Sequence, residues 1–141
     1  MVDVVECMAA SDNVVRAGFT PKYKDIGTLT SMLTYNTAPA DEQKMKPLRF
    51  KNCHYSMLYD PPIDEFSVVR TELKIGEEKM DAVQGPSLII VTSGHGKLVS
   101  KGKDFELKEG SVWFIGAGEE TVLRSQGEMV THRAFVEVDD S

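Results

Sequence analysis

The 141-residue chain has few of the residues that mark whole classes of protein. Its only cysteines, Cys7 and Cys53, are too few for the disulfide framework of a small secreted domain, so a reducing compartment is expected. It has no run of about 18 apolar residues, which excludes a membrane-spanning helix. The first residues include Asp3 and Glu6 and no basic cluster, which predicts no signal peptide. We therefore expect a cytoplasmic protein with no membrane partner.

Basic residues are also in the minority. The chain has 16 lysines and arginines against 22 aspartates and glutamates, a net charge of −6. Nucleic-acid binding needs a basic surface that displaces counterions from phosphates, so we expect no nucleic-acid partner. A small anionic ligand stays possible, because a local pocket of Arg and Lys can form in an acidic protein.

Histidine is scarce, and its spacing is unfavourable for a metal site. No two of the three histidines share i,i+2 or i,i+4 spacing, so sequence-local ligands cannot assemble a zinc site. We expect His54 to be solvated in a polar loop, His95 to be a turn residue, and His132 to be an inward-facing core residue. Cys7 is predicted to be a buried structural thiol. The chain also lacks a GxSxG elbow, a P-loop and a GxGxxG motif.

From about Asp60 onward, short runs of β-branched residues alternate with glycine-containing turns. The runs lie at residues 66–73, 87–93, 96–100, 111–117, 121–125 and 129–138. Strands at this spacing are typical of an antiparallel sandwich or barrel. The segment Gly94-His95-Gly96 is predicted to be a turn between two of them, and Trp113 to be buried.

The N-terminal part of the chain has a different sequence pattern. Residues 2–9 and 14–19 are predicted to form short strands around a polar turn. Residues 25–35 predict a short helix capped by Asp25, followed by a polar loop up to about residue 55. The apolar face of this helix would comprise Ile26, Leu29, Met32 and Leu33.

Residues 109–121, EGSVWFIGAGEET, resemble the second half-motif of the cupin jelly roll. Gly110, the apolar run 112–115 and the turn 116–118 fit a motif in which a metal-binding His follows three residues after the last glycine. Thr121 occupies that position, and His95 stands alone in the place of the first half-motif. We therefore expect a jelly roll without the metal chemistry of the cupins.

The segment ECMAASDNVVRAGFTPK, from Glu6 to Lys22, resembles the signature of the type I phosphomannose isomerases, E-C-M-A-x-S-D-N-x-V-R-A-G-x-T-P-K. The resemblance extends over essentially the whole chain and is greatest to the fungal members. It implies a zinc-dependent, cupin-based isomerase that interconverts mannose 6-phosphate and fructose 6-phosphate in GDP-mannose biosynthesis.

The resemblance also implies roles for four residues. Arg16 would be the catalytic cation, because aldose–ketose isomerisation passes through an enediolate whose negative charge a fixed guanidinium stabilises. Glu6, Asp12 and Lys22 match family positions near the substrate cleft. Lys22 would meet a hydroxyl or the phosphate, and Asp12 would orient Arg16. Each of these two residues also has an alternative without a function in catalysis: Asp12 could form an Asx turn, and Lys22 could be solvated.

The family's zinc ligands, a Q-x-H pair, a Glu and a His, would all precede Met1. The resemblance therefore implies a mainly β C-terminal fragment in three parts: the closing strands of the catalytic cupin domain (1–24), a helix with a connecting loop (25–56) and a C-terminal jelly roll (57–141). Its partners would be a sugar phosphate and the missing N-terminal catalytic domain. Alone, the chain is expected to bind no zinc and to be inactive, and its start in mid-domain predicts a truncated protein.

Two other functions stay open at this point. The chain could be a metal-free, cupin-like module that binds a small ligand, with Thr92, Thr121 and His132 as candidates for a polar cluster inside the jelly roll. It could also be a structural β domain without a ligand, which fits the missing cupin histidine and the acidic surface.

Overall fold

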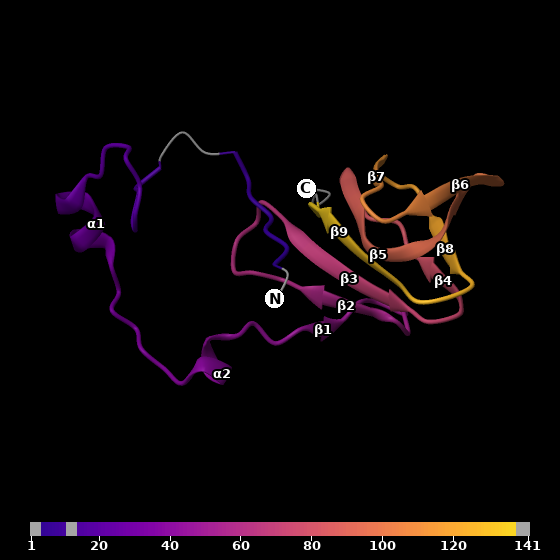
Figure 1. Ribbon diagram of the computed structural model, residues 1–141, viewed down its shortest axis with the longest axis horizontal. Coiled ribbons are helices and arrows are strands. Elements are labelled where there is room, and N and C mark those ends of the chain that lie inside the picture. The colour runs from indigo at the N-terminus through magenta and orange to yellow at the C-terminus, as the bar shows by residue number, and fades with distance from the viewer. Residues whose placement is uncertain (1–3, 11–13, 138–141) are drawn as a thin grey trace. The chain divides into compact units, whose positions relative to one another are not determined.

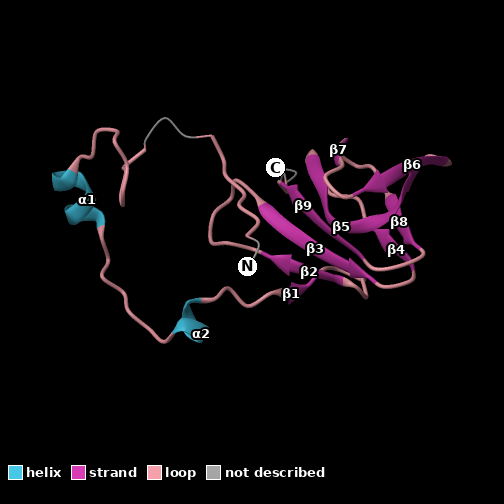
Figure 2. Ribbon diagram, viewed as in Figure 1, coloured by secondary structure: helices cyan, strands magenta, loops and turns pink. Residues whose placement is uncertain are grey.

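The computed structural model describes residues 4–10 and 14–137, which divide into two compact units. The N-terminal unit comprises Met8–Lys44, and the β unit comprises Met1–Cys7 with Met45–Ser141. Within the described residues, both helices belong to the N-terminal unit and all nine strands belong to the β unit (Figure 2).

The N-terminal unit contains two short helices, α1 (Ile26–Met32) and α2 (Ala40–Gln43). Asp25 caps α1 as predicted: its Oδ1 accepts a hydrogen bond from the Thr28 amide at 3.0 Å and its Oδ2 accepts one from the Thr28 hydroxyl at 2.8 Å. These bonds hold the pKa of Asp25 below its ordinary value. The apolar residues of α1 are largely exposed, Ile26 by 65% and Met32 by 58%, so the helix has local capping but little packing.

The strands predicted at 2–9 and 14–19 are not formed in the described residues of these segments. Residues 4–10 and 14–19 carry no helix or strand. A strand persists only when a neighbouring strand satisfies its backbone donors and acceptors. The described strands of the β unit pair only with one another, so these two segments have no such neighbour.

The β unit is a curled antiparallel sheet with the cupin-type jelly-roll fold predicted from the sequence (Figure 1). Its strands are β1 (Leu48–Arg49), β2 (Ser56–Tyr59), β3 (Ser67–Leu73), β4 (Gly76–Met80), β5 (Ser87–Ser100), β6 (Lys103–Lys108), β7 (Val112–Ile115), β8 (Thr121–Ser125) and β9 (Met129–Phe135).

Two layers form the sheet, and β5 belongs to both. The first layer has the order β1-β2-β3-β9-β5-β7, and the second has the order β4-β8-β5-β6. The part of β5 from Ser87 to Gly94 pairs with β7 and β9, whereas the part after it pairs with β6 and β8. A register shift between Val91 and Ser93 marks the bend where β5 passes from one layer to the other.

The turn predicted at Gly94-His95-Gly96 is wrong, because β5 runs through it without interruption. The two glycines serve a different purpose. A Cβ on Gly94, which has φ +78°, would lie 1.9 Å from the Glu128 carbonyl oxygen. A Cβ on Gly96 would lie 2.3 Å from that of Arg124. The glycines therefore mark the close approach of neighbouring backbones at the bend.

The core lies on the inner faces of the two layers. Its buried apolar residues are Phe50, Cys53, Val69, Leu73, Met80, Val83, Ile89, Val91, Leu98, Leu107, Ile115, Leu123, Met129 and Phe135. Trp113 was predicted to be buried, but it is only partly buried and packs against the core beside Phe105, with 5.1 Å between ring centroids. In β9, the alternation that sends Phe135 inward also sends Arg133 inward. His132 consequently lies on the outer face, so its predicted inward orientation is wrong.

Candidate functional site

The four residues suggested by the signature do not all fall within one described unit. Arg16 and Lys22 belong to the N-terminal unit, where Arg16 is half-buried and Lys22 is exposed. Glu6 belongs to the β unit and is exposed. Asp12 lies outside the described residues. The catalytic and binding roles of these four residues therefore stay predictions.

The backbone after Arg16 is restrained by local contacts. Gly18 takes φ +72°, a left-handed conformation that glycine adopts without strain. The Lys24 ammonium donates a hydrogen bond to the Gly18 carbonyl at 3.2 Å, and the Lys22 amide donates to the Thr20 hydroxyl at 3.3 Å. The Arg16 guanidinium forms no ion pair with any residue that the structure describes. The segment thus presents a cation whose charge those residues leave uncompensated.

A polar cluster lies on the outer face of the first layer. His132 stands opposite Arg70 of β3 and Ile90 of β5 in the strand register. The Thr92 hydroxyl lies 3.2 Å from Nδ1 of His132 and donates to the Val130 carbonyl at 3.3 Å. These residues line a groove of about 830 Å³ with a mixed polar and apolar surface.

Only two of the three candidates for an internal ligand site come together in this cluster. Thr92 and His132 face outward, whereas Thr121 is buried on the inner side of β8. The structure therefore does not assemble the internal polar cluster that a cupin-like small-ligand module would need from these three residues.

The pKa of His132 is lowered, first by burial and then by the neighbouring Arg70 guanidinium, with Glu72 opposing them. Because the folded protein resists protonation of this ring more than the unfolded chain does, His132 should reduce the free energy of unfolding as pH falls below about 6.5. We expect His132→Gln to flatten the fall in stability between about pH 7.5 and pH 5.5, measured by urea unfolding. The exposed His54 supplies a control, His54→Gln, that should keep the wild-type slope. Identical slopes for wild type and His132→Gln would contradict the assignment.

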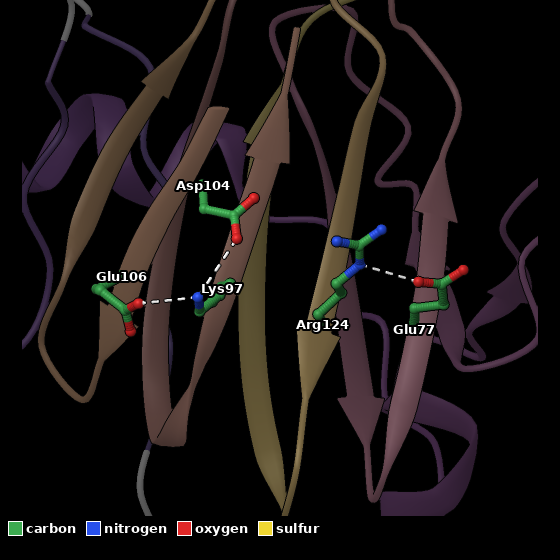
Figure 3. A network of polar contacts seen from close by, with 5 residues as sticks. All are labelled: Glu77, Lys97, Asp104, Glu106 and Arg124. Atoms are coloured by element: carbon green, nitrogen blue, oxygen red, sulfur yellow. Dashed lines mark hydrogen bonds and ion pairs between the residues drawn. The ribbon is translucent and has the colours of Figure 1, made fainter. Parts of the chain in front are cut away.

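Four charged residues form a row across the second layer (Figure 3). Glu106, Lys97, Arg124 and Glu77 are register partners on β6, β5, β8 and β4. The Lys97 ammonium lies 3.3 Å from carboxylate oxygens of Asp104 and Glu106, and the Arg124 Nε donates to Glu77 at 2.9 Å. Hydrogen bonds to Asp104 and then Glu106 raise the pKa of Lys97. Carboxylates thus neutralise both cations, so this row is an exposed cross-strand ladder and a weak candidate for binding an anion.

The described residues offer no fit for a resident metal. They contain no group of three or more His, Cys, Asp or Glu side chains placed to hold an ion. Burial and the nearby Glu78 raise the pKa of the Cys53 thiol, which disfavours the thiolate that zinc requires. Cys7, predicted to be buried in a strand, is half-buried and lies outside any strand.

The chain is similar to known proteins over nearly its whole length. A family model described as "Phosphomannose isomerase type I C-terminal" matches residues 56–103. The chain is 48% identical over 150 residues to the mannose-6-phosphate isomerase of Aspergillus fumigatus, covering 96% of this chain and 33% of that protein. It is 47% identical over 141 residues to that of Saccharomyces cerevisiae, again covering 96% of this chain and 33% of that protein. The chain is homologous to the C-terminal part of the type I phosphomannose isomerases.

Solved structures of phosphomannose isomerases share the fold. The mannose 6-phosphate isomerase of Salmonella typhimurium, bound to its substrate and to zinc, is 28% identical with a TM-score of 0.75, covering 93% of this chain and 32% of that one. Its apo form is 27% identical with a TM-score of 0.74 and the same coverage. The resemblance to fungal phosphomannose isomerases found in the sequence is thus confirmed. The chain spans about a third of the length of the relatives it matches.

No helix among the described residues combines the length and apolar character needed to span a membrane.

The structure also contains a polar residue that the sequence interpretation missed. Arg133 is 1% exposed inside the jelly roll, although arginine is seldom fully buried. A signal was present: in the alternation of residues 129–135, Arg133 shares a face with Met129 and Phe135. The phosphomannose isomerase signature, residues 6–22, does not include Arg133.

Proposed function

We propose that this chain is the C-terminal part of a zinc-dependent mannose-6-phosphate isomerase that interconverts mannose 6-phosphate and fructose 6-phosphate. The observation that carries the proposal is the 48% identity to the Aspergillus fumigatus enzyme over 96% of this chain. We further propose that the enzyme acts in the cytoplasm, in GDP-mannose biosynthesis. Its parts would be the end of the catalytic cupin domain (1–24), a helix and connecting loop (25–56) and the C-terminal jelly roll (57–141).

The partner of this chain would be the N-terminal catalytic domain that the relatives' greater length implies. Exposed apolar surface supports this partner. On the outer face of the first layer, Leu88 lies opposite Phe114 and Ile90 lies opposite Val112, and their side chains are 53%, 69%, 37% and 58% exposed, respectively. A cluster of four large apolar side chains on one sheet face is typical of a surface that another domain covers.

Arg16 would stabilise the reaction's anionic intermediate. Moving a proton between C1 and C2 of the sugar creates an enediolate, and a guanidinium that is always protonated can donate to its oxygens. The restrained turn around Gly18 would limit the positions open to Arg16. Lys22 would bind the phosphate or a hydroxyl, Asp12 would orient Arg16, and Glu6 would lie near the sugar.

Zinc, when bound to the complete enzyme, would act as a Lewis acid on the sugar oxygens. The described residues do not fit a zinc site, so its ligands are assigned to the N-terminal domain and no step performed by this chain depends on contact with the ion. The zinc in the Salmonella typhimurium structure is consistent with a metal elsewhere in the enzyme.

A chimera tests the proposed function. The N-terminal two-thirds of the Aspergillus fumigatus enzyme would be joined to this chain at the start of their alignment, with the intact Aspergillus enzyme as the positive control. We expect the purified chimera to interconvert the two sugar phosphates, and this chain alone to be inactive. A chimera that is folded and contains stoichiometric zinc but shows no turnover would reject the proposal.

A further inference from the structure

The interior of the jelly roll contains a cation without a counter-charge. Arg133 on β9 is 1% exposed, and its Nε donates a hydrogen bond to the Ser87 hydroxyl at 3.0 Å. Its Nη1 and Nη2 atoms are buried and have no hydrogen-bond partner among the residues that the structure describes. None of the carboxylates in the described part of the chain lies within ion-pair distance of this guanidinium.

Two hydroxyl groups in the same interior are also unpartnered. Thr131 lies two residues before Arg133 on the inner face of β9, and its Oγ1 has no hydrogen-bond partner in residues 4–10 and 14–137. The buried Oγ1 of Thr121, on β8 of the opposite layer, likewise lacks a partner within the described part of the chain. Thr121 is the register partner of Met80, whose sulfur lies 3.6 Å from the Ser56 hydroxyl of the first layer. The layers therefore contact each other at Ser56 and Met80, beside Thr121 in the strand register.

The other buried ionisable groups do not neutralise Arg133. The Glu78 carboxylate is engaged by the amides of His54 and Tyr55 and by the Ser56 hydroxyl. Cys53, whose thiolate would attract the guanidinium, is held in its neutral thiol form by burial and by nearby carboxylates. A protonated guanidinium that is removed from water without a counter-charge is costly, since its hydration is lost and nothing replaces it.

We propose that the jelly-roll interior binds one small monovalent anion, such as chloride, through Nη1 and Nη2 of Arg133. Both Nη atoms can only donate hydrogen bonds, which suits an anion. A monoatomic anion requires the least room in a packed interior, and its single charge balances one guanidinium. Water would satisfy the N–H groups but would leave the charge uncompensated.

Thermal unfolding of the 141-residue chain in sodium chloride and in sodium gluconate, at equal ionic strength, tests this site. A ligand that binds only the folded state raises the melting temperature in a saturable way, so chloride should raise it by about 5 °C or more. Arg133→Met should abolish the difference between the two salts. The matched control is Arg124→Met, an arginine on the exposed charged row, which should retain the difference. Equal melting temperatures of the wild-type chain in both salts would overturn the proposal.

Crystals of the wild-type chain grown in sodium bromide give an answer even if Arg133→Met does not fold. We expect an anomalous bromide peak beside Nη1 and Nη2 of Arg133. Density there without an anomalous signal would mean that water alone occupies the position, and would reject the anion.

Discussion

Arg16→Lys in the chimeric isomerase is expected to lower kcat by about 10²–10³ while changing KM by only a few-fold. The substitution keeps the positive charge but removes the planar fork of N–H donors that can hold two oxygens of an enediolate in fixed positions. The lost interaction strengthens as negative charge develops in the transition state, so the effect falls on kcat more than on KM. Steady-state kinetics on the purified chimera with mannose 6-phosphate measures both constants.

The control for this experiment is Arg49→Lys, which makes the same change at an exposed arginine at the end of β1. It should leave kcat and the melting temperature close to those of the unmodified chimera. If Arg16 instead has a structural role, Arg16→Lys would lower the melting temperature while turnover per folded molecule stays near normal. That pattern would remove Arg16 from the proposed catalytic machinery.

Gly94→Ala is expected to destabilise the β unit by about 3 kcal/mol or more, through backbone strain and steric overlap. Gly94 has φ +78°, and an added Cβ would lie 1.9 Å from the Glu128 carbonyl oxygen and 3.0 Å from the Met129 Cα. The obstacle is backbone, which cannot turn aside as a side chain can. We expect the melting temperature to fall by about 10 °C or more, measured by circular dichroism.

Gly116→Ala makes the same chemical change where it should do little. A Cβ on Gly116 would meet nothing within 4 Å, and its φ is not in the left-handed region. The melting temperature of the Gly116→Ala variant should therefore stay within a few degrees of the wild-type value. If Gly94→Ala were as stable as Gly116→Ala, the bend in β5 would not depend on the close approach of Glu128.

Several patterns that depend on neighbours in sequence predicted elements of the fold correctly. The Asp25 cap and the runs corresponding to β3, β8 and β9 are local signals, and the structure confirms them. The strand β4, with the sequence GEEKM, was not predicted because it contains three charged residues. Its buried positions are Glu78 and Met80, and Glu78 is stabilised there by donors from residues 54–56, a contact that local sequence does not reveal.

Features that depend on distant strands were predicted less well. The sequence of β9 alternates clearly, but the alternation alone does not say whether His132 or Arg133 faces the core. Pairing decides it: Arg133 stands between Val69 of β3 and Ile89 of β5, both buried, so it points inward with them. Likewise, the signature that suggested Arg16 describes a chemical role in a complete enzyme, and no contact among the described residues tests that role.

The continuous path of β5 through both layers has a consequence for how the β unit opens. Its first part lies between β7 and β9 in one layer and its second part lies between β6 and β8 in the other, so β5 is flanked on both sides in each layer. Small fluctuations can fray edge strands such as β6, but exchange of the β5 amides with solvent deuterium requires the opening of a ladder at the centre of a layer. Because β5 is the one described strand that both layers share, it should contain the slowest-exchanging amides of the jelly roll.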